Sequence, residues 1–119
     1  MAFKDVKVGK FTIPMRASGR TPLYYRQIFH KDILSAFSSD GDNLTMASEN
    51  VPEVAYVLAM SGEGADMSKL NEDTFAEWLD QFEAMDLLVA GEDIFNVYLG
   101  NLTTTSKAKK KVSAKQSAN

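Results

Sequence analysis

The sequence predicts a mainly α protein of the α+β type, in which an N-terminal β-hairpin is followed by about four helices and a disordered basic C-terminal tail. Three observations predict this fold. Apolar and polar residues alternate on both sides of Gly9-Lys10, apolar residues recur at helical intervals from Thr21 onward, and the last residues are rich in Lys, Ser and Thr. Residues 1–102 are expected to form a single globular domain, because this length is common for one domain.

The predicted hairpin covers residues 3–15. Gly suits the first position of a type II′ turn, so we expect a two-residue turn at Gly9-Lys10. This turn pairs Val8 with Phe11 and places the apolar residues of both strands on one face. Pro14 has no amide hydrogen and is expected to face outward from an edge.

The first helix is predicted over about residues 21–38. Thr21 is a suitable N-cap, and Pro22 suits the first helical position. Turn-forming residues 38–43 are expected to end the helix. Its buried face is predicted to contain Tyr25, Ile28, Phe29, Ile33, Ala36 and Phe37.

Three further helices are expected, at about 52–61, 71–85 and 87–102. The helix at 71–85 has the strongest local signature, because Asn71 is a good N-cap and the acidic residues that follow it favour the positive end of a helix. Residues 103–119 are rich in Lys, Ser and Thr and cannot bury enough apolar surface to offset the entropy of ordering. We therefore predict a disordered tail.

Charge is segregated along the chain. The formal net charge is -3, yet residues 40–100 carry fourteen of the sixteen acids with Lys69 as their only base, while the tail is purely basic. An acidic central domain repels a phosphate backbone, so its composition disfavours nucleic acid as a partner. The basic tail is the segment that could reverse this conclusion.

Several classes of chemistry lack the residues they need. Cysteine is absent and His30 is the single histidine, which argues against thiolate or His-rich metal sites. No known local signature pairs His30 with a Ser or Cys nucleophile, so a catalytic role is not expected. Residues 40–43 resemble the start of a calcium loop, but Val51 stands where the closing Glu is required. Residues 1–7 do not have the apolar stretch of a signal peptide, and no run in the sequence approaches the roughly 20 apolar residues of a membrane span. We expect a soluble protein without enzymatic activity, cofactor or membrane partner.

Four segments in a fixed order carry a resemblance to a known family. They are residues 8–17 (VGKFTIPMRA), 21–34 (TPLYYRQIFHKDIL), 75–79 (FAEWL) and 93–98 (DIFNVY). With the Thr/Ser/Lys tail, they make the chain similar to the tail assembly chaperones of phages with long flexible tails that infect Gram-positive bacteria. The resemblance covers nearly the whole chain.

The resemblance implies a protein-binding role in the host cytoplasm. Such chaperones bind the tape measure protein, keep it soluble, promote polymerisation of the major tail tube protein around it, and are not expected in the mature virion. The chain is rich in aromatic residues, and we expect Trp78, Phe82, Phe95 and Tyr98 to contribute to the partner-binding groove.

The family is often made in two lengths by ribosomal frameshifting, and the run Lys109, Lys110 and Lys111 is compatible with a slippery codon sequence. A frameshift-extended form would contact the tail tube protein. A solubilising tail explains the same lysines equally well.

Two other functions stay open at this point. The protein could be a structural minor tail component of the virion, or a small nucleic-acid-binding accessory protein that acts through its basic tail. Self-association into a homo-oligomer is compatible with the aromatic content.

Overall fold

The computed structural model describes residues 2–40 and 43–100, and it confirms the predicted fold class of an N-terminal hairpin followed by about four helices. A last helical segment spans residues 91–100. The predicted tail, residues 103–119, lies outside the described residues. The elements, in chain order, are β1 (Ala2–Val8), β2 (Phe11–Ala17), α1 (Thr21–Phe29), η1 (Ile33–Ala36), β3 (Phe37–Asp40), β4 (Asn43–Met46), η2 (Ser48–Asn50), α2 (Val51–Glu63), η3 (Met67–Lys69), α3 (Glu72–Leu79) and α4 (Asp86–Val89).

The N-terminal hairpin has the predicted register. Val8 pairs with Phe11 across a two-residue turn, and Val6 pairs with Ile13. Gly9 has a φ of 59°, whereas the following residue has no positive φ, which is the pattern of a type II′ turn. The apolar face is covered, because Val6 and Val8 are buried.

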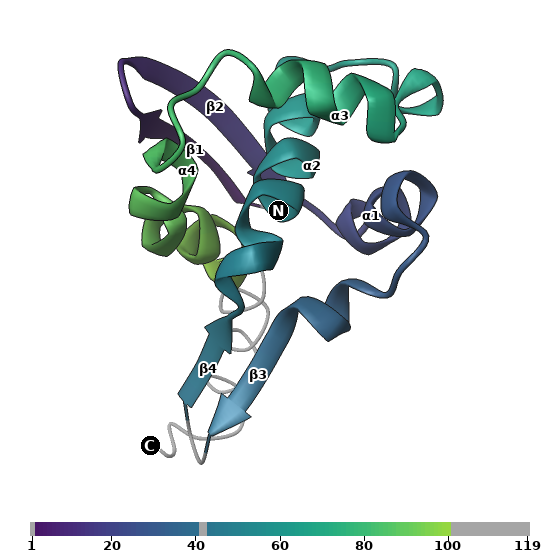
Figure 1. The fold of residues 1–119 in the computed structure, drawn as a ribbon. Helices are drawn as coiled ribbons and strands as arrows, with labels where there is room; N and C mark the ends of the chain where they lie inside the picture. The colour runs from purple at the N-terminus through teal and green to yellow at the C-terminus, as the bar shows by residue number, and fades with distance from the viewer. Residues whose placement is uncertain (1, 41–42, 101–119) are drawn as a thin grey trace.

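Helix α2 is the central element of the fold. It contacts β2, α1, α3 and α4, and Figure 1 shows it running through the middle of the molecule. The prediction of a helix at 52–61 is confirmed and extended to Val51–Glu63. Gly64 then ends the helix in the left-handed conformation, with a φ of 75°. All residues from Val54 to Met60 are buried, since neighbouring elements cover the helix on several sides.

Helix α1 is shorter than predicted. It begins at Thr21 with Arg20 as N-cap, so Thr21 is the first helical residue and not the cap. It ends at Phe29 instead of residue 38, because His30 adopts a left-handed φ of 60° that breaks the helical hydrogen bonding. The predicted apolar positions after this break are still buried or half-buried, at Ile33, Ala36 and Phe37, although they lie on η1 and β3.

A second hairpin occupies the region that was predicted to end the first helix. Strand β3 pairs antiparallel with β4, and Phe37 lies opposite Met46. The interpretation of residues 38–43 as turn residues that end a helix was therefore wrong, because residues 38–40 and residue 43 belong to paired strands. Figure 1 shows this hairpin extending away from the helices.

The last two predicted helices are correctly placed but too long. Asn71 caps α3 as predicted, and its side chain accepts a hydrogen bond from the amide of Thr74 at 3.0 Å. The helix ends at Leu79 instead of residue 85, and turns follow. The predicted helix at 87–102 is divided at Ala90, where α4 ends before the segment 91–100 begins.

Candidate functional site

An apolar groove lies at the N-terminal end of α2. Its volume is about 350 Å³, and it opens between the β4–η2 segment on one side and the helices after residue 86 on the other. We call it the apolar groove. Its lining residues are Thr45, Met46, Ser48, Val51, Leu88, Gly91, Glu92 and Phe95.

Aromatic packing around Phe95 fixes one wall of the groove. The Phe37 ring stacks on Tyr98 with centroids 5.3 Å apart and an interplanar angle of 13°, and it lies 5.8 Å from the Phe95 ring. Tyr98 is buried, whereas Phe95 is half-buried and lines the groove. The second hairpin is thereby attached to the last helical segment, which holds Met46 opposite Phe95.

Exposed apolar side chains extend the groove along α4. Met85 is 59% exposed, Leu88 is 40% exposed and Val89 is 79% exposed. A single exposed apolar residue is ordinary on a protein surface, but here three lie within five residues and one of them, Leu88, lines the groove, and clustered exposed apolar residues are typical of interaction sites.

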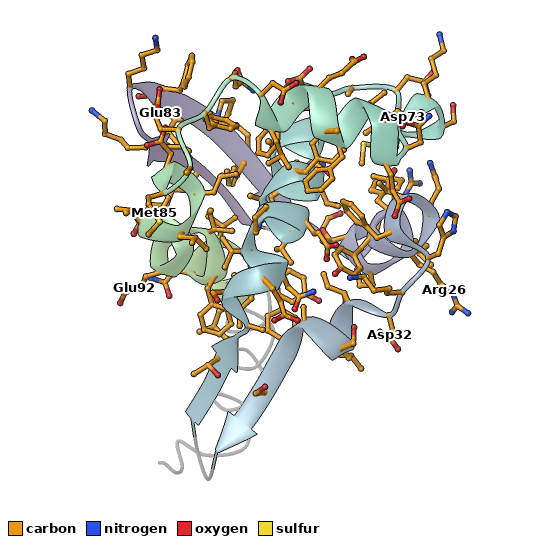
Figure 2. The ribbon with its side chains drawn as sticks, in the orientation of Figure 1. Arg26, Asp32, Asp73, Glu83, Met85 and Glu92 are labelled. Carbon is orange, nitrogen blue, oxygen red and sulfur yellow. The ribbon has the colours of Figure 1, made fainter. Side chains whose placement is uncertain are left out.

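The stretch of chain that forms one side of the groove is rich in acidic residues. Glu92 lines the groove, and Glu83, Asp86 and Asp93 lie on the same stretch of chain, which contains no Lys or Arg between residues 83 and 100. Figure 2 shows Glu83, Met85 and Glu92 along one side of the molecule. The groove therefore combines apolar contact area with one carboxylate, that of Glu92, which suits a segment that has an apolar stripe and a basic flank.

The structure places the four residues predicted to bind a partner in two separate clusters. Phe95 and Tyr98 gather around Phe37 below the apolar groove, as described above. Trp78 and Phe82 instead pack against each other on the other side of the core, with ring centroids 4.8 Å apart at 74°. The predicted frameshift residues Lys109, Lys110 and Lys111 lie outside the described residues.

The Trp78 cluster joins α3 to the rest of the fold. The Trp78 ring lies 5.3 Å from that of Tyr56 on α2, and the Phe82 ring lies 5.5 Å from that of Phe11 at the start of β2. Both residues are half-buried. Trp78 and Phe82 contact the core and hold α3 in place. Of the four predicted residues, Phe95 lines the apolar groove, and Tyr98 packs behind it against Phe37.

A buried polar cluster holds α1 against α2. The Tyr25 hydroxyl donates to a Glu53 carboxylate oxygen at 2.6 Å, and Asn50 donates to the same oxygen at 3.1 Å. Lys31 forms an ion pair with Glu53 at 3.0 Å. Burial raises the pKa of Tyr25, and the hydrogen bond to Glu53 raises it further. Every member has a partner, so we interpret the cluster as structural.

The part of the chain that the structure describes has neither a metal site nor a membrane-spanning helix. No group of three His, Asp or Glu side chains there could hold a metal ion. No helix within 2–40 or 43–100 is long and apolar enough to cross a membrane. His30 is exposed and lies at the end of α1.

Comparisons of the chain with protein-family models, with curated proteins and with solved structures find no match.

Proposed function

We propose that this protein is a tail assembly chaperone of a long-tailed phage, and that its apolar groove binds a helical segment of the tape measure protein. Binding there would cover apolar residues of the partner and keep it soluble while the major tail tube protein polymerises around it. The role needs no catalysis and no cofactor, and it places the protein in the host cytoplasm during assembly.

The observation that carries the proposal is the apolar groove together with the exposed side chains of α4. Met46, Val51, Leu88 and Phe95 present apolar surface in a hollow of about 350 Å³, which is room for one or two large side chains of a docked helix. A helix docks in such grooves through residues spaced by three, four and seven positions. The ordered resemblance to phage tail assembly chaperones supplies the identity of the helix.

A pair of double variants tests the groove. Leu88→Asp with Val89→Asp places two charges on the exposed surface of α4, and Leu23→Asp with Leu34→Asp is the matched control, because those leucines are 66% and 69% exposed outside the groove. Burial of one aliphatic side chain stabilises a complex by about 1.5–3 kcal/mol, and the α4 variant replaces two such side chains. The variant should therefore bind the partner at least about a hundredfold more weakly.

The assay is co-expression with the long helical protein encoded next to this one, followed by co-purification and measurement of how much of that protein stays soluble. The control variant should behave like the unchanged protein. If the α4 variant is correctly folded by circular dichroism and still co-purifies normally with the partner, the apolar groove is not the binding site. Precipitation of the partner with both variants alike would show that the effect is not specific to α4.

The two other functions predict different results. A structural minor tail component would be found by mass spectrometry in purified virions. A nucleic-acid-binding protein would lose binding when the residues after Leu102 are deleted and would bind far more weakly in high salt, whereas contact through an apolar groove tolerates salt.

A further inference from the structure

A second hollow lies at the opposite end of α2 from the apolar groove. Its volume is about 480 Å³, and it is enclosed by the end of β2, the turn before α1, and the end of α2 with the loop that follows. We call it the basic pocket. Its lining residues are Arg16, Ser18, Gly19, Arg20, Tyr24, Ser61, Gly64, Ala65 and Met67.

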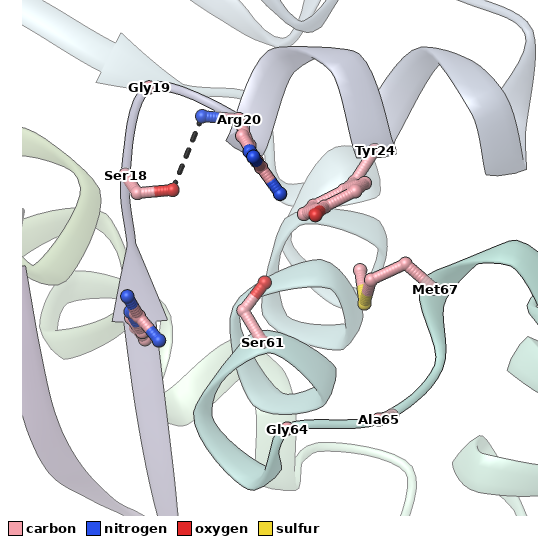
Figure 3. A pocket seen from close by; sticks show the side chains of 9 residues that line it. Ser18, Gly19, Arg20, Tyr24, Ser61, Gly64, Ala65 and Met67 are labelled. Carbon is pink, nitrogen blue, oxygen red and sulfur yellow. Dashed lines mark hydrogen bonds between the residues drawn. The ribbon is translucent and has the colours of Figure 1, made fainter.

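The basic pocket contains two guanidinium groups, and no acidic side chain is among its lining residues. Arg20 is exposed, and a guanidinium group stays protonated throughout the ordinary pH range. Figure 3 shows the Ser61 hydroxyl pointing into the hollow toward Arg20 and Tyr24. α1 also begins here, at Thr21, and its positive end adds to the attraction for an anion.

One wall of the basic pocket is apolar. Met67 is buried, and its side chain faces the Tyr24 ring across the hollow in Figure 3. Ala65 continues this wall. A ligand that matches the whole pocket therefore has an anionic head for the arginines and a short aliphatic part for Met67 and Ala65.

The flanking charges favour a single anionic group over a polyanion. Glu63 and Asp66 are exposed and lie directly beside Gly64 and Ala65 in the chain. Acidic residues next to the pocket in the chain disfavour an extended phosphate backbone along this surface more than one anionic group held in the hollow. Planar guanidinium groups also match the geometry of a carboxylate.

We propose that the basic pocket binds one carboxylate of a partner polypeptide, presented on an aliphatic stem. A glutamate side chain and a chain-terminal carboxylate share this chemistry. The inference does not depend on the proposed function, because the pocket and the apolar groove are formed by different residues.

The test is an NMR titration of the full chain, which contains three arginines, Arg16, Arg20 and Arg26. Their side-chain Nε–H signals are followed while a capped alanine peptide containing one glutamate is added. A peptide with glutamine in its place and an uncapped alanine peptide with a free terminal carboxylate are titrated separately. Arg26 is the internal control, because it is exposed on α1 but does not line the pocket.

We expect saturable shifts of the Arg16 and Arg20 signals with a carboxylate peptide, and none with the glutamine peptide. Saturation by either carboxylate peptide supports the proposal and identifies which source fits. Arg16→Ala and Arg20→Ala should each weaken binding about tenfold, since each removes a charge-assisted hydrogen bond, whereas Arg26→Ala should leave it unchanged.

Three results would overturn the proposal. The first is the absence of saturable shifts with both carboxylate peptides. The second is an equal response of Arg26, which would indicate general electrostatic attraction. The third is tighter binding of a short single-stranded oligonucleotide at Arg16 and Arg20, which would assign the pocket to phosphate instead of carboxylate.

Discussion

Replacing Gly62 with alanine tests how closely α2 packs on the N-terminal hairpin. Gly62 lies in α2 where the helix crosses β2, and a Cβ atom added there would overlap the carbonyl oxygen and carbon of Pro14. These Pro14 atoms belong to the backbone of a paired strand, so they cannot rotate away as a flexible side chain would. The helix and the strand would have to separate.

The expected effect is the difference between two opposing terms. Alanine in place of glycine in a helix is worth up to about 1 kcal/mol through backbone entropy. Overpacking a tight contact costs about 1–3 kcal/mol, and a fixed backbone neighbour puts Gly62→Ala at the upper end. We therefore expect a net loss of about 2 kcal/mol, or roughly 10 °C in Tm for a domain of this size.

Gly91 provides a matched control. It also lies in a helical segment, but a Cβ there would meet only the Val51 side chain, at 3.5 Å, which is an ordinary contact. Gly91→Ala should keep or raise stability, by up to about 1 kcal/mol. The assay is urea unfolding followed by the fluorescence of Trp78, which packs against Tyr56 and Phe82 in the core. Equal stability of the two alanine variants would refute the close approach of α2 to β2.

Two further predictions concern capping and ionisation. Asn71→Ala removes the hydrogen bond to the Thr74 amide and should cost about 1 kcal/mol, seen as a Tm about 4–8 °C lower; an unchanged Tm would contradict this role. Burial raises the pKa of Tyr25, Tyr56 and Tyr98. The folded-state pKa of these tyrosines exceeds the unfolded value of about 10, so the unfolded chain loses its protons first as the pH rises. The free energy of unfolding should therefore be at its full value below about pH 10 and decrease above it, and the decrease should be shallower in Tyr25→Phe. Urea unfolding from about pH 8 to about pH 11 measures this, and a flat profile would contradict it.

The N-terminal hairpin could be predicted because its signal is local. The alternation around Gly9-Lys10 determines both the turn and the Val8–Phe11 register, and the structure has both. The second hairpin could not be found in this way. Phe29, Ile33 and Phe37 keep helical spacing up to its first residue, and nothing in the sequence shows that His30 adopts a left-handed φ. The Asp40-Gly41 dipeptide is a hairpin signal, but the polar residues beside it have low β-propensity.

The apolar groove could be predicted only in part. Phe95 was identified from its aromatic character and lies in the groove. Met46 and Leu88 were not, because they meet only after the second hairpin places residues 45–51 beside residues 88–95. Trp78 and Phe82 have the same aromatic character as Phe95 but pack on Tyr56 and Phe11. Sequence composition cannot separate the two situations, since both give half-buried rings.

The central position of α2 has a consequence for the order of events during synthesis. Met15 and Ala17 of β2 are buried in the folded protein, yet they leave the ribosome uncovered, because α2, the helix that contacts this strand, is encoded only at residues 51–63. At about 5–20 residues per second, the emerging chain exposes this apolar ribbon for several seconds before its cover arrives. A two-stranded ribbon is barely stable by itself, so a nascent chain that stops before residue 51 has no folded state to reach.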